Sequence, residues 1–477
     1  MDFERARKED VNARIHSAVA KAKEKQEDLN AVVSFVDVEN QIEALKDIDE
    51  KQPFYGMPIV LKDNVNMKGV RTTASSRILD NYVSIYDAHI TTKLKEAGAV
   101  VIAKASMDEL GMGGTNENAY TGPVCNPWDT SRISGGSSGG SAVLVSSGVV
   151  PFAIGTDTGD SIRKPAAFNG IIGMKPTYGR ISRYGVIPYA SSLDHVGYFT
   201  TSMKDAAVAL EVLAGRDDRD MTSSYKEVEK YSENLNSDLS GKKIAILDNV
   251  QNAITNEDVK ENFNSLMGKL EARGATIEHV SLDDKLMHAL LPVYYIIANA
   301  EATANHSNLD GIRFGQREDG ESVEDVMINS RTKGLSSNVR KRFVIGSYSL
   351  FAANQDKIFR KAQKVRRLIV EELKRTLDQY DVVIANASAT IAPKFNEKVQ
   401  AGNDDIVTEN YMVLGNFSGY PSMTVPTGFV EGMPIGINMT AKPFEEQTLF
   451  NIGLAIEEET GLKGNDVEVD AWITRQS

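Results

Sequence analysis

The stretch GGSSGGSAVLVSSGVVPFAIGTDTGDSIRKPAAFNG, residues 135–170, joins two loops rich in glycine and serine through apolar segments. A tract of this composition is typical of a flexible linker. Here AVLV and VVPFAI interrupt the tract, and a linker has no reason to bury such residues. The stretch therefore predicts a loop, a buried helix and a second loop, with both loops entering the core.

Ser161, in the second of these loops, has two interpretations. Its side chain could cap a helix that begins within SIRKPAAF. It could also be a nucleophile, and a serine hydroxyl is a weak nucleophile until a base removes its proton. Residues 155–170 contain no histidine. A nucleophilic Ser161 would therefore need a base from another part of the chain.

The composition of the 477-residue chain, 41% hydrophobic and 25% charged, is that of an ordinary globular protein. A net charge of −13 argues against nonspecific binding to a phosphate backbone, so we expect any nucleic acid to be held by another subunit. Cys125 is the one cysteine, which excludes an internal disulfide and fits a reducing, cytoplasmic location.

No segment of the sequence predicts contact with a membrane. The most apolar stretch, SAVLVSSGVVPFAIG, is too short to span a bilayer and is broken by Ser, Gly and Pro151. The N-terminal residues are charged throughout and predict an exposed helix rather than a signal peptide. We therefore expect a soluble protein.

Strand and helix patterns alternate along the chain, which indicates one large α/β domain with a mixed sheet. The expected elements are a strand in 58–65, a helix and a strand in 88–105, a strand–helix–strand unit in 242–282, a long polar helical region at about 320–378, a strand in 379–388, two adjacent strands joined through Gly432, and a closing helix in 446–460. Within 1–477 we distinguish an N-terminal helical region (1–50), a core with the two loops (56–200), a region of strand–helix–strand and long helices (201–380), and a return to the core sheet (381–477).

Three familiar kinds of site are not supported by the sequence. The six histidines are scattered without metal-ligand spacing, and Asp194–His195 is the one acid–histidine neighbour pair, so we expect structural roles and no metal. Neither GxGxxG after a strand nor GxxxxGK[ST] occurs, so no phosphate cradle is predicted. Residues 136–140 fit G-x-S-x-G, the nucleophile elbow of α/β-hydrolases, with Ser138 as the nucleophile. Such an elbow needs a strand directly before it, but the preceding residues include Pro127 and no β-branched run.

A lysine could be the base that Ser161 needs. Lys62 ends the apolar run PIVL, and burial would lower its pKa toward neutrality. The alternative is a lysine that extends its amine to solvent at a strand end. The turn of Thr158, Gly159, Asp160 and Ser161 could direct backbone N–H groups at one point as an oxyanion hole. A serine–lysine amide hydrolase is therefore a chemically reasonable hypothesis.

GGSSGGSA followed by GTDTGDSIRKPAAFNGIIGMKPTYGR resembles the amidase signature family in order and spacing as well as in composition. In that family a lysine, a bridging serine with a cis peptide bond and a nucleophilic serine form the triad. The resemblance assigns these roles to Lys62, Ser137 and Ser161, and the family spacing selects Ser137 rather than Ser138 as the bridge. It implies a single large domain, with helices on both faces of a mixed β-sheet.

Within the family, four stretches resemble the glutaminase subunits of tRNA-dependent amidotransferases: 107–129, 175–197, 294–315 and 361–369. Such a subunit hydrolyses glutamine and needs no cofactor of its own. It passes ammonia to a kinase-like, tRNA-binding subunit that uses ATP and Mg to convert Glu-tRNA(Gln) to Gln-tRNA(Gln). A small third subunit completes a heterotrimer.

The resemblance also suggests how glutamine is bound, since the family uses a Met-Gly pair, an arginine and an aspartate. These positions are Met112, Gly113, Arg342 and Glu409 here, and the tyrosine near the substrate is Tyr294 or Tyr295. Glu409 departs from the family because its side chain is one methylene longer than aspartate.

Asp160 also departs from the family, which usually has a glycine there. Asp tolerates unusual backbone angles, so the loop can survive. Its charge would oppose an oxyanion, so we expect Asp160 to point away or to pair with Arg163 or Lys164.

Two other functions stay open: a stand-alone amidase acting on another small amide, and a non-catalytic scaffold, against which the intact triad argues.

Overall fold

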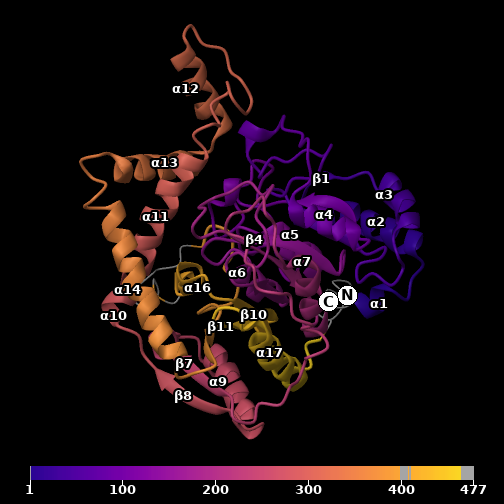
Figure 1. Cartoon of the computed structure of the whole chain (residues 1–477), viewed down its shortest axis with the longest axis vertical. Coiled ribbons are helices and arrows are strands. Elements are labelled where there is room, and N and C mark those ends of the chain that lie inside the picture. Colours follow the sequence, from indigo (N-terminus) through magenta and orange to yellow (C-terminus); the bar gives the residue numbers. More distant parts are fainter. Residues whose placement is uncertain (1, 398–406, 408–409, 464–477) are drawn as a thin grey trace.

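The computed structural model describes residues 2–397, 407 and 410–463, and within them the core is an 11-stranded mixed sheet (Figure 1). The strand order is β1-β3-β2-β4-β6-β5-β10-β11-β9-β7-β8. The strands are β1 (Val32–Phe35), β2 (Pro58–Lys62), β3 (Val100–Ala105), β4 (Phe152–Asp157), β5 (Ile172–Lys175), β6 (His195–Thr200), β7 (Lys243–Leu247), β8 (Thr276–Val280), β9 (Val382–Asn386), β10 (Ser422–Val430) and β11 (Met433–Ala441). Both parallel pairs, such as β2 with β4, and antiparallel pairs, such as β4 with β6, occur.

Helices cover both faces of the sheet, as expected. Successive side chains of a strand point to opposite faces, and on β7 Ile244 and Ile246 join one apolar cluster while Ala245 and Leu247 join another. The first face carries α1 (Phe3–Ala6), α4 (His89–Glu96), α7 (Met203–Leu213), α9 (Glu257–Ala272) and α17 (Glu446–Thr460). The second carries α2 (Val11–Leu29), α5 (Gly139–Ser146), α6 (Arg163–Asn169), α8 (Asp248–Gln251), α10 (Asp284–His288), α11 (Leu290–Asn305), α13 (Ser337–Leu350), α14 (Phe359–Leu377) and α16 (Val413–Ser418).

Most of the predicted elements are confirmed. The segment 58–65 contains β2, 88–105 contains α4 and β3, and 242–282 contains β7, α9 and β8. β10 and β11 pair antiparallel, and Gly432 between them has a φ of 77°, a backbone angle that glycine adopts at no steric cost. The remaining elements are α3 (Glu39–Ala44), α12 (Val323–Gly334) and the 3-10 turns η1 (Leu45–Asp47), η2 (Arg77–Leu79) and η3 (Glu109–Gly111).

The prediction for residues 135–170 is right about the helix and incomplete about the segment after it. Every residue of α5 is buried, as expected. β4 lies at Phe152–Asp157, where only a loop was expected. It is placed inside the sheet between β2 and β6 and is buried on both faces. Such a strand shows a continuous apolar run instead of alternation, so periodicity does not reveal it.

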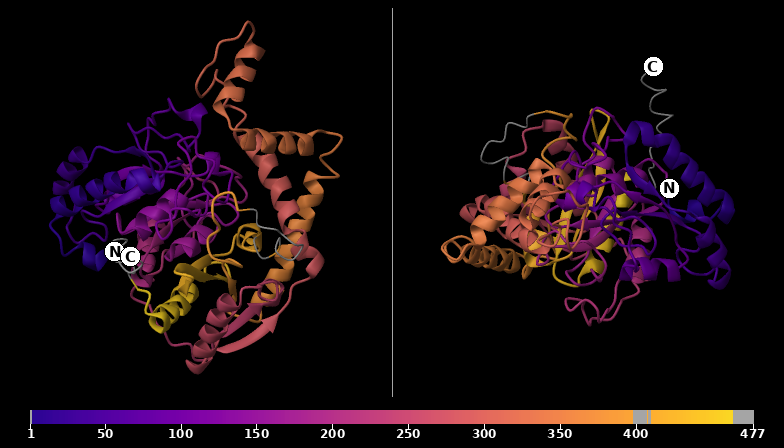
Figure 2. Two further views of the ribbon diagram at one scale, coloured as in Figure 1. Left: turned by 180° about the vertical axis from the view of Figure 1, so that it is seen from behind. Right: turned by 90° about the horizontal axis from the view of Figure 1, so that it is seen from above.

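Two helical predictions need correction. The N-terminal residues form α1 and α2, and α2 buries Ile15, Ala18 and Ala22 against the sheet, so this region is only partly exposed. The region 320–378 is three helices, of which α12 stands away from the body of the molecule (Figures 1 and 2). Across the described residues, every helix is too short or too polar to reach through a lipid bilayer.

Candidate active site

Lys62 is the last residue of β2, and its amine is fully enclosed by protein. Its Nζ lies 2.8 Å from Ser137 Oγ, 2.7 Å from Ser138 Oγ and 3.3 Å from the carbonyl oxygen of Thr156. Burial lowers the pKa of Lys62 to about 7, although the carboxylates of nearby aspartates act in the opposite direction. The amine therefore does not extend to solvent, and near pH 7 a large share of it is neutral.

Ser137 and Ser138 occupy the tight turn before α5, and the Gly136–Ser137 peptide bond is cis, as the resemblance implied. The turn has no room for side chains at its glycines: a Cβ on Gly136 would lie 2.1 Å from a carboxylate oxygen of Asp108. The backbone N–H of Asp108 also donates to the Ser137 carbonyl at 3.2 Å. These contacts hold the backbone of the Ser137 turn in place.

Ser161 lies shortly after β4 and is nearly fully buried. Its carbonyl accepts a hydrogen bond of 3.1 Å from the backbone N–H of Ser138, which joins the two loops. α6 begins at Arg163 without a side-chain cap, so Ser161 is not a helix cap. Among the described residues the Ser161 hydroxyl has no hydrogen-bond partner, and those of Ser137 and Ser161 are not bonded to each other.

An ion pair holds both ends of the 158–161 turn. Arg163 and Asp157 are fully buried and form two hydrogen bonds, of 2.9 and 3.0 Å. Arg163 also donates to the carbonyl of Gly159 at 2.8 Å. Burial raises the pKa of Asp157, but the charge of Arg163 outweighs it, so the pKa stays below its usual range. Within the described residues, the backbone N–H groups of Gly159 and Ser161 have no acceptor, so both are available to a ligand oxygen.

The predicted substrate residues meet this turn from α11 and α13. Tyr294 on α11 lies over Gly159, where an added Cβ would be 3.1 Å from the phenol oxygen. Arg342 on α13 is 5.0 Å from the centre of the Tyr295 ring, and its Nη1 donates to the hydroxyl of Tyr189 at 2.9 Å. Its buried Nε has no partner among the described residues. The guanidinium is therefore able to bind an anionic group near the turn.

Met112 and Gly113 border the same region. The carbonyl of Met112 accepts a hydrogen bond of 3.0 Å from Asn338 on α13. Gly113 packs against Asp108 so closely that a Cβ would lie 2.2 Å from the carboxyl carbon. The structure thus connects the Met-Gly pair both to α13, which carries Arg342, and to Asp108 beneath the Ser137 turn.

Comparison with known proteins agrees with this geometry. The family model described as Amidase matches residues 13–450. The chain belongs to the amidase family. The A subunit of glutamyl-tRNA(Gln) amidotransferase from Pediococcus pentosaceus is 40% identical over 426 residues, 89% of this chain and 87% of that protein. The A subunit of the same name from Geobacillus thermodenitrificans is 41% identical over 413 residues, 86% of this chain and 85% of that protein.

Solved structures show the same relationship. The crystal structure of the glutamyl-tRNA(Gln) amidotransferase A subunit from Thermotoga maritima superposes with a TM-score of 0.81 at 34% identity, covering 96% of this chain and 95% of that one. A peptide amidase from Stenotrophomonas maltophilia superposes with a TM-score of 0.80 at 25% identity, covering 95% and 94%. Proteins named for different substrates therefore share this fold. The substrate of this chain must be inferred from the side chains of its site and not from the fold.

Some residues of this amidase do not follow the sequence predictions. Asp160 was expected to point away from the oxyanion or to pair with Arg163 or Lys164. The Arg163 alternative is wrong, because its guanidinium is bound to Asp157, Asn416 and backbone carbonyls. The Lys164 alternative stays a prediction. Glu409 lies outside the described residues, and its assignment to the substrate amino group also stays a prediction.

Ser138 is confirmed as a poor candidate for a hydrolase elbow. It is fully buried, no strand runs into it, and its hydroxyl donates to the Thr156 carbonyl at 3.0 Å. Asp194 and His195 do not form a catalytic pair either, since Asp194 accepts from Thr158 and His195 Nδ1 contacts the carbonyl of Leu193. In the described part of the chain, no group of three or more potential metal ligands occurs.

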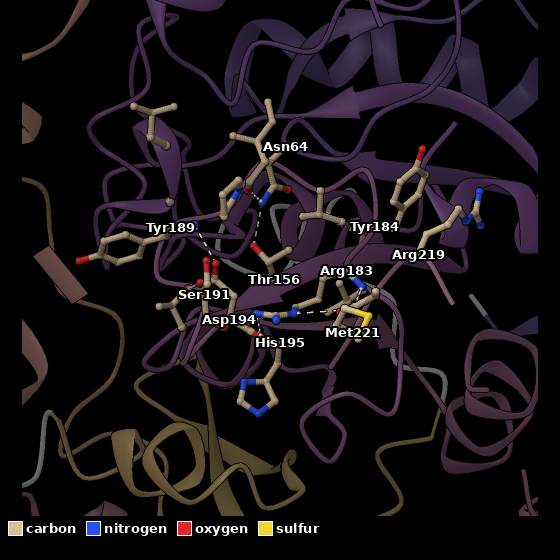
Figure 3. Close-up of a pocket in the computed structure, with 18 residues that line it drawn as sticks. Asn64, Thr156, Arg183, Tyr184, Tyr189, Ser191, Asp194, His195, Arg219 and Met221 are labelled. Carbon is tan, nitrogen blue, oxygen red and sulfur yellow. Dashed lines mark hydrogen bonds and ion pairs between the residues drawn. The ribbon is translucent and has the colours of Figure 1, made fainter. Parts of the chain in front are cut away.

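A cavity of about 250 Å³ lies next to the loops of the candidate site (Figure 3). None of the three triad residues lines it, but Thr156, Thr158 and Tyr189 belong both to its wall and to the surroundings of the triad. Asn64, two residues after Lys62, points at Thr156 and donates to its hydroxyl at 3.1 Å (Figure 3). Gly111 also lines the cavity, and a Cβ added to it would lie 3.9 Å from Ser137 Oγ, so the cavity approaches the Ser137 turn.

Sequence reasoning missed several residues that build the site. Tyr189 binds Arg342, Ser138 and the Thr156 carbonyl hold Lys62, and Asn416 supports the Asp157–Arg163 pair. Tyr189 falls in one of the stretches that carried the resemblance, but an isolated tyrosine has no spacing that reveals its role. Residues that act through a carbonyl, such as Thr156, leave no signal in side-chain chemistry.

Proposed function

We propose that the chain is the glutaminase subunit of a glutamyl-tRNA(Gln) amidotransferase, located in the cytoplasm. The observation that carries this proposal is the buried Lys62 amine, with a pKa of about 7, in contact with Ser137 beside the loop that presents Ser161. Relatives at 40–41% identity over most of their length bear that name. In this proposal Lys62, Ser137 and Ser161 are the triad.

The surroundings of Lys62 suit a proton acceptor. A neutral amine has two N–H groups and one lone pair. Ser138 Oγ and the Thr156 carbonyl lie where they can accept the two N–H groups. The lone pair then faces Ser137 Oγ, 2.8 Å away. Ser138 and Thr156 thereby orient the base, and Ser137 relays a proton from Ser161 to it.

The reaction proceeds in two halves. Ser161 Oγ attacks the carbon of the glutamine carboxamide, and its proton moves to Ser137 as the Ser137 proton moves to Lys62. Backbone N–H groups of the 158–161 turn stabilise the oxyanion. The C–N bond breaks as the relay returns the proton to the leaving nitrogen, which gives ammonia and a glutamyl ester on Ser161. Water, deprotonated by the same relay, hydrolyses the ester to glutamate.

Glutamine is held by residues away from the triad. Arg342 has free N–H groups and suits the α-carboxylate, because a guanidinium can bind a carboxylate through two parallel hydrogen bonds. Tyr294 covers the turn on which the carboxamide reacts. Met112, Gly113 and Tyr295 line the remainder of the site, and we propose Glu409 as the partner of the α-ammonium group.

The ammonia is used elsewhere in the assembly. We propose that a tRNA-binding, kinase-like subunit, with ATP and Mg, activates the glutamyl group of Glu-tRNA(Gln), and that ammonia from this chain converts it to the amide. A small third subunit completes the heterotrimer. This chain then needs no cofactor of its own and contacts tRNA mainly through its partner.

The test is ammonia release from glutamine, measured for the chain alone and for the chain co-expressed with its partner subunits, with Glu-tRNA(Gln) and ATP added. We expect strong release in the complex and its loss in Ser161→Ala. Ser131→Ala, which removes an exposed hydroxyl ahead of the catalytic loop, is the matched control and should remain active. Full activity of Ser161→Ala would refute the assignment.

The similarity to a peptide amidase keeps a second function in view. A stand-alone amidase would have the same triad and would need no partner. The same assay separates the two, because turnover of varied small amides by the chain alone, without stimulation by partner subunits, would establish the stand-alone enzyme. A folded chain that releases no ammonia in either setting would indicate a scaffold.

A further inference from the structure

The surface of α13 carries an apolar face that nothing in the described part of the chain covers. Val344, Ile345 and Tyr348 are 69%, 43% and 57% exposed, and Phe351, directly after the helix, is 62% exposed. The opposite side of α13 packs Val339 and Phe343 into the core against α11. Large apolar side chains gathered on one helix face are typical of an interaction site.

Basic residues lie on both sides of this face along the chain, and we call them its basic rim. Residues 331–375 contain 13 lysines and arginines but only three acidic residues, in a chain whose net charge is −13. Several of these cations are already bound, such as Arg366 to the carbonyl of Phe417 and Arg367 to Glu371. Four exposed lysines form no ion pair with a carboxylate of the described residues: Lys341, Lys357, Lys361 and Lys364. Arg340 is also exposed, and its charge acts on the carboxylate of Glu109.

α13 and the start of α14, which carry these residues, lie on one flank of the molecule (Figure 1). α13 leads through residues 351–358 into α14, and the two helices form the outer edge of the structure in Figures 1 and 2. Arg340 and Lys341 precede the apolar face on α13, and Lys357, Lys361 and Lys364 come after it around the turn. An apolar centre with a charged rim is the usual anatomy of a protein–protein interface.

The charge decides between the candidate occupants. Two copies of the chain, joined through this face, would bring two basic rims together, which is unfavourable. A nucleic acid would suit the rim, but interfaces with nucleic acids are polar at their centre and would leave the four apolar side chains without a matching surface. A protein that presents apolar residues bordered by Asp and Glu satisfies both the centre and the rim.

We infer that α13 and the first turns of α14 dock an acidic, apolar-centred surface of a partner subunit of the amidotransferase, an inference that rests on the proposed function. Arg342, which faces the substrate site, is on the same helix, less than one turn from Val344 and Ile345. A partner seated on the outer face of α13 therefore lies one helix diameter from bound glutamine.

The test uses the whole chain and its purified partner subunits. In one variant, Val344→Asp is combined with Tyr348→Asp; in another, Lys357, Lys361 and Lys364 are each changed to Glu. Val323→Asp on α12 is the matched control, because Val323 is also a 69% exposed valine on a helix. Complex formation is measured by sedimentation velocity and by titration at low and high salt, and ammonia release by each chain alone checks the fold.

Both variants should bind the partner subunits at least about tenfold more weakly than the parent chain. The charge variant should also lose most of the salt dependence of binding, and Val323→Asp should bind as the parent does. Unchanged assembly of the Val344/Tyr348 variant would overturn the docking inference and leave the proposed function intact. So would a parent chain that dimerises, or that retains Glu-tRNA(Gln) alone, through this face. A parent chain that does not bind the partner subunits at all would overturn both.

Discussion

The loops that carry Ser137 and Ser161 and the arm formed by α11, α13 and α14 border the proposed active site but are built in opposite ways. In residues 135–164, which contain these two loops with α5 and β4 between them, almost every residue is buried. In the arm, one side packs on the core while the other exposes apolar and basic residues. In the proposed function, the groups of the chemical step are therefore fixed by short-range packing, whereas substrate and partner would be recognised by helices that pack on the core along one side only.

The glycines of these loops explain why the loops can be recognised in the sequence. A Cβ on Gly136 would lie 2.1 Å from Asp108, and one on Gly140 would lie 2.5 Å from the carbonyl of Ser106. No other residue fits at such distances, so the geometry requires a glycine pattern that is visible in the sequence. The arm has no such requirement, since its residues contact the site through long side chains from the helix surface.

The largest expected effect on activity distinguishes the hydroxyl of Ser161 from that of Ser138. Ser161→Ala should lower kcat for glutamine hydrolysis by about 10⁴-fold, because the nucleophile is lost. Ser138→Ala should lower it only about tenfold, the size expected when one hydrogen bond that orients Lys62 is removed. Steady-state ammonia release from the purified complex measures both. A reversed order, with Ser138 essential, would instead support a hydrolase elbow.

The base gives the next largest effect, through pH. Lys62 acts as base only when neutral, and its pKa is about 7, so kcat/KM should rise about tenfold per pH unit below 7 and level off above about 8. Lys62→Arg keeps the charge but is never neutral, so it should be inactive at every pH. Lys93→Met, which alters a lysine bound to the carbonyls of Val212 and Ala214, should keep the inflection. A flat profile from about pH 5.5 to about 8.5 would contradict the relay.

Substitutions in the arm should change KM for glutamine rather than kcat. Arg342→Met should raise KM for glutamine about 100-fold, because a charged hydrogen-bonding group for the α-carboxylate is lost, and should change kcat little. Tyr189→Phe removes the hydroxyl that holds Arg342 and should raise KM by a smaller factor. Lys204→Met alters an exposed cation on α7, outside the proposed docking surface, and serves as the control. A fall in kcat with KM unchanged would show that Arg342 acts on the transition state.

The same contrast explains what could be predicted from the sequence. The α/β class and the buried α5 follow from apolar patterns, whereas the assignments of Lys62, Ser137 and Ser161 rest on the resemblance to a family whose glycine motif packing enforces. β4 was missed because a strand buried on both faces has no alternation. Tyr189 reaches Arg342 across 153 positions of sequence, and Thr156 contributes a carbonyl that every residue has. Only the folded chain shows these contacts.

Asp160 gives the smallest expected effect and tests how tightly the loop geometry constrains its sequence. A glycine is usual here in the family, but Asp160 does not have a positive φ, so the backbone does not require glycine. Its carbonyl accepts the N–H of Lys164 at 2.9 Å, a bond that any residue can make. Its charge reaches Tyr294, whose phenol pKa is raised first by burial and further by Tyr189 and Asp160.

Asp160→Gly should therefore fold normally and change kcat by no more than about threefold, and Asp160→Asn should match it, because the carboxylate is expected to point away from the oxyanion. The two variants are compared with the parent chain by kcat and KM for glutamine and by melting temperature. A large gain in kcat in both would mean that the carboxylate faces the oxyanion and slows the reaction. A loss of activity in both would make Asp160 part of the catalytic turn, and a loss in Asp160→Gly alone would mean that the loop needs a side chain for its rigidity.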